Sequence, residues 1–142
     1  MASQAVRDEA GFQARMRLSV LWISVTLCYA YADIIALYIP GGLQMMLQGK
    51  MGTWPVSQEL LLGVSVLMAV SPVMAFLSIA FGEGAVRVLN VVFGLAFLAI
   101  ALTSTVLAWR LGNLHYVFFS ALEGVMNGLI VWYALRWPRR RA

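Results

Sequence analysis

The sequence predicts an all-α membrane protein: a four-transmembrane-helix bundle of up-down-up-down topology with both termini in the cytoplasm. Three observations support this prediction. First, 62% of the 142 residues are hydrophobic and only 11% are charged, whereas a soluble domain is about 45–50% apolar and about 25% charged. Second, the apolar residues are gathered in four stretches that are each long enough to cross a bilayer as a helix. Third, lysine and arginine are distributed unequally between the two sides that this topology creates.

The four spans are predicted from the apolar runs between charged or turn-forming residues. They cover residues 18–39, 60–81, 88–109 and 114–137. Together they form one transmembrane domain over 18–137, with a cytoplasmic N-terminal segment over 1–17 and a basic cytoplasmic tail over 138–142. A cleaved signal peptide is the alternative for the first span, because basic residues and an apolar run precede the small residues Ala30 and Ala32. The apolar run continues past this point, which favours a full span.

The connections between the spans predict which helices are neighbours. The first connection, residues 40–59, is long and contains helix-breaking proline and glycine, while its methionine and leucine side chains are expected to rest in the membrane interface. The second and third connections, residues 82–87 and 110–113, are short enough to force consecutive helices to run antiparallel as neighbours. In such a bundle the first and fourth helices are also in contact.

The basic residues predict the orientation. The side that holds both termini carries eight of the ten basic residues: Arg7, Arg15, Arg17, Arg87, Arg136, Arg139, Arg140 and Arg141. The opposite side carries only Lys50 and Arg110. Cytoplasmic loops hold the excess of lysine and arginine, so both termini are predicted to be cytoplasmic in a bacterial inner membrane. The topology anchors are Arg15, Arg17, Arg87, Arg139, Arg140 and Arg141. The five tryptophans lie mostly near span ends, where indole favours the interface.

Several classes of function are excluded or disfavoured by composition. The single cysteine, Cys28, excludes an internal disulfide and a two-cysteine redox relay, and the single histidine, His115, excludes a bis-histidine haem within the chain. No metal-ligand spacing, nucleotide-binding glycine loop or catalytic triad is present in the sequence. The net charge of +4 is explained by membrane topology rather than by nucleic acid. We therefore expect no cofactor, no metal, no catalytic residue and no nucleic-acid partner.

Two carboxylates lie inside predicted spans, where an ionisable side chain costs about 2.5–3.5 kcal/mol. Asp33 lies about 9 Å below the outer boundary of the first span, and Glu123 lies roughly 13–14 Å below that of the fourth, at 1.5 Å per residue. If the first and fourth helices are adjacent, both side chains reach the same region of the outer half. Because two like charges cannot both stay ionised cheaply, at least one carboxylate is expected to hold a proton at neutral pH.

Polar side chains surround these two acids. A stripe on the fourth helix is spaced by four, three and four residues: Tyr116, Ser120, Glu123 and Asn127. Gly124 and Gly128 form a GxxxG pattern that would let another helix approach closely. Tyr29 shares a face of the first helix with Asp33. The candidate intramembrane polar pocket therefore consists of Asp33, Glu123, Asn127, Tyr29, Tyr116 and Ser120.

Two interpretations of this cluster are open. Polar side chains in membrane helices often only fix the packing, and such contacts contribute about 0.6 kcal/mol on average. Two carboxylates without a lysine or arginine inside the spans are a costly way to fix helices, which favours a functional site at Asp33 and Glu123. Arg110 is the nearest cation: pairing with Asp33 would make the site a structural ion pair, but Glu59 is an equally available partner.

Four strings carry a family resemblance: YADIIALYIPGG, LLGVSVLMAVSPVMAFLS, RVLNVVFG and YVFFSALEGVMNGLIVWYALRW. Together, over about residues 17–137, they resemble a bacterial family of small four-span membrane proteins of unknown function. The most specific elements are Asp33 followed by Pro40-Gly41, Arg87 with Asn90, and Glu123 with the WYALRW ending. The resemblance implies the four-span topology and no activity. Its members often carry a glutamate in the second helix, where this chain has the uncharged MAVSP.

These observations predict a non-enzymatic membrane module, either a structural or accessory subunit or a binder of a small amphipathic ligand. The alternative is a small proton-coupled transporter whose two carboxylates exchange protons for substrate, as the similar size and span number of small multidrug exporters suggest. A third class is a quinone-linked oxidoreductase subunit, similar in size to DoxX-like proteins, in which Tyr29, Tyr116 and Glu123 contact a quinone head group. The partners expected are the lipid bilayer and either further copies of the chain, as a homo-oligomer, or a larger membrane complex.

Overall fold

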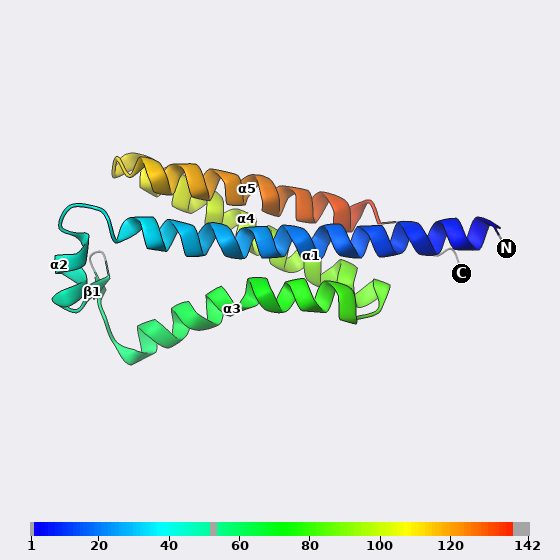
Figure 1. Ribbon diagram of the computed structural model, residues 1–142, viewed down its shortest axis with the longest axis horizontal. Helices are drawn as coiled ribbons and strands as arrows, with labels where there is room; N and C mark the ends of the chain where they lie inside the picture. The colour runs from blue at the N-terminus through cyan, green and yellow to red at the C-terminus, as the bar shows by residue number, and fades with distance from the viewer. Residues whose placement is uncertain (1, 52–53, 138–142) are drawn as a thin grey trace.

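The protein is mostly helical, and four of its helices are long and apolar enough to cross a membrane. The computed structural model describes residues 2–51 and 54–137. In chain order its elements are α1 (Ala2–Ala36), α2 (Gly42–Leu47), β1 (Lys50–Met51), β2 (Trp54–Pro55), α3 (Gln58–Ala80), α4 (Glu83–Arg110) and α5 (Leu114–Leu135) (Figure 1). The four apolar helices are α1, α3, α4 and α5. The predicted helical character is therefore confirmed, and so is the number of helices that are long and apolar enough to span a membrane.

Several boundaries differ from the predicted ones. Helix α1 begins at Ala2 rather than at residue 18, so the N-terminal segment continues the helix of the first span. Helix α4 begins at Glu83, immediately after its N-cap Gly82, because nothing in the short connection interrupts the helix. The tail lies outside the described residues, and with it the predicted anchors Arg139, Arg140 and Arg141.

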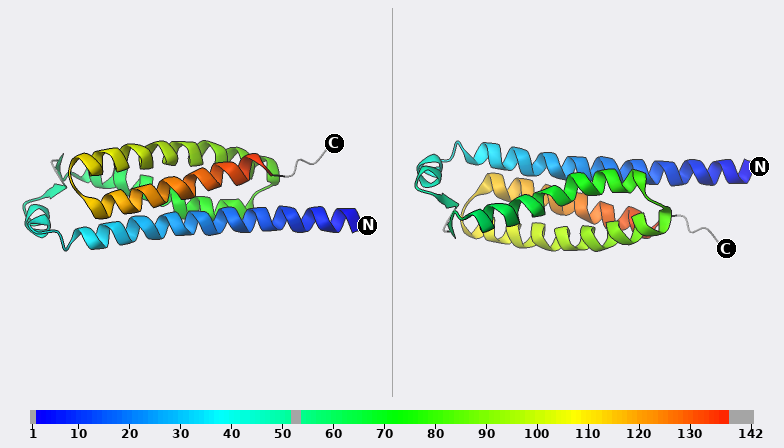
Figure 2. Two further views of the ribbon diagram at one scale, coloured as in Figure 1. Left: turned by 90° about the horizontal axis from the view of Figure 1, so that it is seen from above. Right: turned by 90° about the horizontal axis from the view of Figure 1, so that it is seen from below.

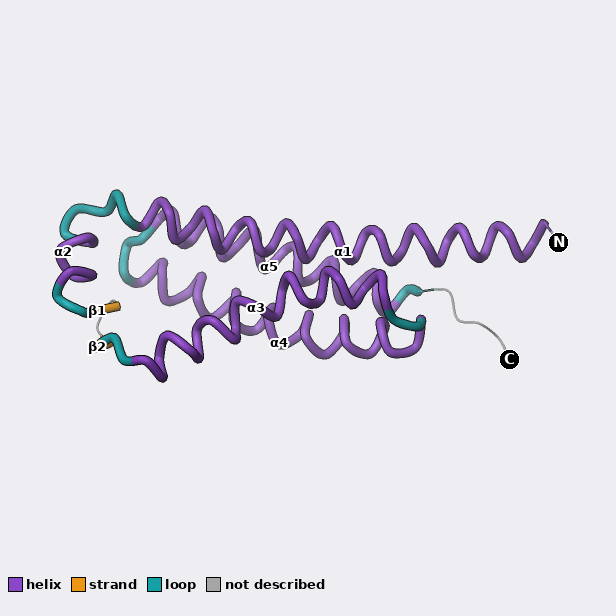
Figure 3. The backbone as a smooth tube through the Cα atoms, turned by 60° about the horizontal axis from the view of Figure 1, so that its bottom comes forward, coloured by secondary structure: helices purple, strands orange, loops and turns teal. Residues whose placement is uncertain are grey.

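The long first connection contains regular structure that the proline and glycine content did not predict. Gly41, the N-cap of α2, adopts φ +80, which L residues with a side chain rarely adopt, so a glycine is favoured where this turn leads into α2. Strands β1 and β2 then pair antiparallel, with Lys50 opposite Pro55 and Met51 opposite Trp54. Figure 3 shows α2 and these strands lying beyond the ends of the long helices, at one end of the bundle.

Helix α5 holds the bundle together. It packs against both α4 and α1, and α1 also packs against α3. Figure 2 (left) shows α5 lying between α4 and α1. The apolar core is centred on Trp22 of α1, whose ring meets Phe97 of α4 edge-on at a centroid distance of 5.7 Å. Fully buried Leu18, Val25 and Ile130 complete the centre of this core.

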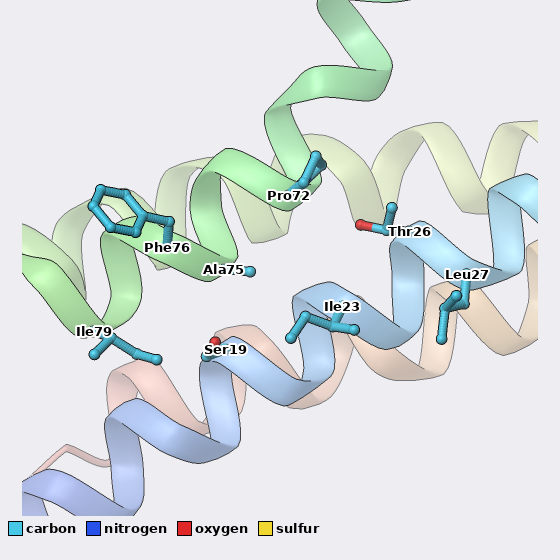
Figure 4. A pocket seen from close by; sticks show the side chains of 8 residues that line it. All are labelled: Ser19, Ile23, Thr26, Leu27, Pro72, Ala75, Phe76 and Ile79. Carbon is cyan, nitrogen blue, oxygen red and sulfur yellow. The ribbon is translucent and has the colours of Figure 1, made fainter.

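Helix α3 is bent, and only its second half joins the bundle. Its buried residues are Ser71, Met74, Ala75 and Ser78, and none precedes Ser71. Pro72 lies at the bend (Figures 1 and 4), because proline lacks an N–H and its ring clashes with the carbonyl one turn earlier. The second half borders a groove of about 380 Å³ against α1 (Figure 4). The half of the bundle next to β1 and β2 is therefore more open than the other half.

Candidate functional site

Helix α1 places Tyr29 and Asp33 one turn apart near its C-terminal end. The Tyr29 ring is partly buried and lies 6.3 Å from the ring of Phe97. Asp33, by contrast, is exposed, although the neighbouring Ala32 is buried. The first half of α3 stands away from α1 (Figure 1), and no residue before Ser71 in this helix is buried. The Asp33 carboxylate is therefore reachable from outside the protein.

Helix α5 places Glu123 and its polar neighbours on the face that meets α1 and α4. Ser120 and Glu123 are each 5% exposed and Asn127 is fully buried. The Asn127 side chain donates from Nδ2 to the backbone oxygen of Glu123 at 2.9 Å, while its Oδ1 is buried without a hydrogen-bond partner. Ser120 is turned toward α4, because its hydroxyl lies 2.9 Å from Oγ1 of Thr105. The polar stripe of α5 is thus divided between two neighbouring helices.

Asp33 of α1 and Glu123 of α5 lie on helices that pack against each other, close enough for their carboxylates to interact electrostatically. Glu123 acts in the same way on Tyr29, and Asp33 acts on Tyr116. Four of the six predicted pocket residues, Tyr29, Asp33, Tyr116 and Glu123, therefore form one cluster. We call Asp33 and Glu123 the carboxylate pair.

The carboxylate pair lacks protein partners. Among residues 2–51 and 54–137, neither Asp33 nor Glu123 makes a side-chain hydrogen bond or an ion pair. Arg110 pairs with neither Asp33 nor Glu59 within the same residues, and it lies on the outer surface of α4 beside Val106 and Leu107. The ion pair between Arg110 and Asp33, which the sequence left open, is therefore not formed. Nothing else in the described chain neutralises the pair.

Close helix approach occurs at a different glycine from the predicted ones. A Cβ added to Gly94 of α4 would lie 2.9 Å from Cγ2 of Val131 and 3.2 Å from Cγ2 of Ile130 on α5. A Cβ on Gly124 would make an ordinary 3.9 Å contact with Ala101, and one on Gly128 would meet nothing within 4 Å. The position in this interface that leaves no room for a side chain is therefore Gly94 of α4.

A second polar cluster lies in the other half of the bundle. Asn90 is fully buried on α4 and accepts a hydrogen bond from the indole of Trp22, while Ser78 of α3 lies beside it. Trp22 is therefore a core residue and not an interfacial one, because its N–H has a buried acceptor. The sequence signal for this cluster was Asn90 itself, a polar residue inside the third span.

Three of the predicted basic anchors, Arg15, Arg17 and Arg87, lie at this same end. Arg15 donates to the backbone oxygen of Ile79 at 3.4 Å, and the guanidinium of Arg17 lies 5.5 Å from the ring of Tyr133. Arg87 donates to the last carbonyl of α5 at 3.2 Å. These arginines bridge helix ends, and a cation is favourable beside the carbonyls of a helix C-terminus.

Residues 9–142 match the model of a family of unknown function (DUF6326). The chain belongs to this family. No curated protein and no solved structure matches the chain. Within the described residues of this DUF6326 member, no group of three or more histidine, cysteine, aspartate or glutamate side chains could hold a metal ion.

Proposed function

We propose that this DUF6326 protein is a four-span protein of the bacterial inner membrane that binds a small amphipathic ligand at the carboxylate pair without transforming it. The helices run up-down-up-down and both termini are cytoplasmic. The orientation is supported by Arg15, Arg17 and Arg87 at one end of the bundle, with Lys50 and Arg110 at the other. The carboxylate pair then lies in the outer half of the membrane.

The unpartnered state of the pair is the observation that carries this proposal. The polar groups that connect helices in this protein make short hydrogen bonds, as Trp22 does with Asn90 at 2.7 Å. Asp33 and Glu123 make none with the described residues. Each ionisable side chain costs about 2.5–3.5 kcal/mol inside a membrane helix, and no interhelical contact offsets that cost here. A ligand that binds the pair offsets it.

The surroundings indicate the chemistry of the ligand. An ionised carboxylate only accepts hydrogen bonds, so its complement is a positive charge or a group rich in N–H or O–H donors. Tyr29 and Tyr116 flank the pair, and their rings provide apolar contact for the rest of the ligand. Asp33 is exposed beside the divergent half of α3, which leaves a route from outside to the pair. A small lipophilic amine satisfies all three conditions.

Binding of hexylammonium tests this proposal. The protein is reconstituted in nanodiscs of zwitterionic lipid, and binding of radiolabelled hexylammonium is measured by equilibrium dialysis against empty nanodiscs. We expect saturable binding that weakens at least tenfold in Glu123→Gln and in Asp33→Asn. Glu59→Gln is the matched control, because Glu59 is an exposed acid at the start of α3. Equal binding by all four proteins would contradict the proposal.

A proton-coupled transporter is the second candidate, and the asymmetry of the pair favours it. One acid is exposed and the other is 5% exposed, yet the two interact electrostatically. A proton bound to one changes the affinity of the other for a cation, which is the coupling that an exchanger requires. In liposomes, a gradient of the transported amine would drive proton flux in the wild type and not in Asp33→Asn. Flux that persists in this variant would exclude the transporter.

A further inference from the structure

A pocket of about 330 Å³ lies at the end of the bundle that carries α2 and the two short strands. It is lined by the C-terminal end of α1 and the first turn of α5, through Ala36 and Tyr116, and by residues of α2 and β1. Figure 1 shows α2 and β1 at this end of the long helices. In the proposed orientation the pocket faces the outside of the cell, and we call it the outer pocket. Ligand sites in proteins begin at about this volume.

Three polar side chains line the outer pocket: Lys50, Asn113 and Tyr116. Among the described residues, none of the three makes a side-chain hydrogen bond. Lys50 is the one charged residue in the lining. Asn113 is the N-cap of α5 but makes no side-chain cap bond, so its amide is available. The three side chains supply an ammonium, an amide and a phenol, which together suit the oxygens of a carboxylate.

The rest of the lining is apolar and adaptable. Met45 and Met46 of α2 and Met51 of β1 all line the pocket, together with Ile39 and Val56. Methionine is unbranched and polarisable, so it fits its side chain to ligands of irregular shape. These residues come from the long connection, where the sequence showed methionines without a recognisable spacing. Folding of α2 and β1 brings three of them to the lining of a cavity that Lys50 also lines.

We propose that the outer pocket binds a small amphipathic monocarboxylate, with its head group at Lys50, Asn113 and Tyr116 and its apolar body against the three methionines. The outer pocket shares Tyr116 with the cluster around the carboxylate pair but takes a ligand of opposite charge. None of its other binding contacts involves that cluster, and none involves Asp33 or Glu123, so hexanoate binding is tested separately from the proposed function. Lys50 is the one cation of the lining, which places the ligand carboxylate toward it.

Hexanoate is the probe for the outer pocket. Equilibrium dialysis with the full-length protein in zwitterionic nanodiscs measures its dissociation constant, with hexylammonium and hexanol as competitors of equal chain length. We expect saturable binding of one hexanoate per chain, at least tenfold weaker competition by the other two, and at least tenfold weaker binding in Lys50→Gln. Lys50→Arg keeps the positive charge and should restore most of the affinity. Dodecanoate then distinguishes a membrane-derived fatty acid, which gains affinity from a longer chain, from a short water-soluble acid, which does not.

Arg110→Gln is the matched control. Arg110 is the other basic residue predicted on the outer side, but it lies on the α4 surface and does not line the outer pocket. Its removal changes the net charge as Lys50→Gln does and should leave hexanoate binding unchanged. An equal loss of hexanoate affinity in Lys50→Gln and Arg110→Gln would show that only the net charge of the protein matters, and it would overturn the proposal. Absence of saturable hexanoate binding, or equal competition by hexylammonium, would also overturn it. Loss of hexylammonium binding in Glu123→Gln with hexanoate binding intact separates the two sites.

Discussion

The indole Nε1 of Trp22 donates a 2.7 Å hydrogen bond to Oδ1 of Asn90, and both side chains are fully buried. Asn90 in turn donates from Nδ2 to the backbone oxygen of Val86 at 2.8 Å and to Oγ of Ser78 at 3.1 Å. The Ser78 hydroxyl donates to the backbone oxygen of Met74 at 2.7 Å. Every polar atom of this network has a partner, and the network joins α1, α3 and α4. The network therefore closes the half of the bundle away from β1 and β2 with satisfied hydrogen bonds, whereas the carboxylate pair has none with the described residues.

Replacement of Asn90 tests whether this hydrogen-bond network stabilises the bundle. Asn90→Ala leaves the Trp22 indole N–H buried without an acceptor, so we expect the free energy of unfolding to fall by about 1–3 kcal/mol. Equilibrium unfolding in mixed micelles, followed by far-ultraviolet circular dichroism, measures the change. Thr103→Ala is the control, because the Thr103 hydroxyl is exposed and bonds only to Ala99 of its own helix. A loss no larger than that of Thr103→Ala would show that the network does not hold the helices together.

Replacement of Gly94 tests the contact between α4 and α5. Gly94→Ala puts a methyl group 2.9 Å from Cγ2 of Val131, so we expect a destabilisation of about 1–3 kcal/mol from overpacking. Gly128→Ala has open space around the new methyl and should be neutral or stabilising, since alanine favours a helix by about 1 kcal/mol over glycine. Thermal unfolding of both variants measures the contrast. Val131→Ala should rescue Gly94→Ala. If Gly128→Ala were instead the more destabilised variant, the close contact would lie at the GxxxG pattern and not at Gly94.

Much of the fold was predictable, for a physical reason. In a bilayer every backbone polar group must be satisfied within its own segment, so apolar length alone predicts the four helices. Tertiary details were less accessible. Nothing in the local sequence distinguishes Gly94, which α5 approaches closely, from Gly128, which it does not. Trp22 looked interfacial because indole favours that position, and only the placement of Asn90 on a neighbouring helix makes it a core residue. Asp33 and Glu123 stood out because charge is costly in any span.

The carboxylate pair should behave in the opposite way to Asn90 in stability measurements. Glu123 is 5% exposed and has no partner among the described residues, so Glu123→Gln replaces an ionisable group by a neutral one of the same shape. We expect the free energy of unfolding to rise by about 1–3 kcal/mol, since an unpaired carboxylate in a membrane helix is destabilising. Residues kept for binding often reduce stability in this way. The same unfolding assay measures it, and a loss as large as that of Asn90→Ala would make Glu123 a structural residue.

The orientation is testable by the accessibility of introduced cysteines. Cys28 is buried and is first replaced in Cys28→Ala. Gln48→Cys then places an exposed thiol near the outer pocket, and Gly84→Cys places one in the first turn of α4. In intact cells a membrane-impermeant maleimide should label position 48 and not position 84, and permeabilised cells should label both. Labelling of position 84 alone in intact cells would invert the topology and put the outer pocket in the cytoplasm.

Pro72 controls how far the first half of α3 stands away from the bundle. Pro72→Ala restores the backbone hydrogen bond to Met68 and removes the ring clash, so α3 should straighten toward α1. Spin labels at Ile34→Cys and Ser65→Cys, in the Cys28→Ala background, measure the distance between the two helices by electron paramagnetic resonance. We expect a shorter distance in Pro72→Ala.

Straightening of α3 has a consequence for the carboxylate pair. If the first half of α3 moves against α1, it covers Asp33, which is exposed in the bent form. Hexylammonium binding in Pro72→Ala should then fall or slow, while hexanoate binding should stay unchanged because no described residue of α3 lines the outer pocket. An unchanged distance between the labels would show that packing, and not the proline, sets the bend. A shorter distance with unaltered hexylammonium binding would show that the ligand reaches the pair by a route that α3 does not border.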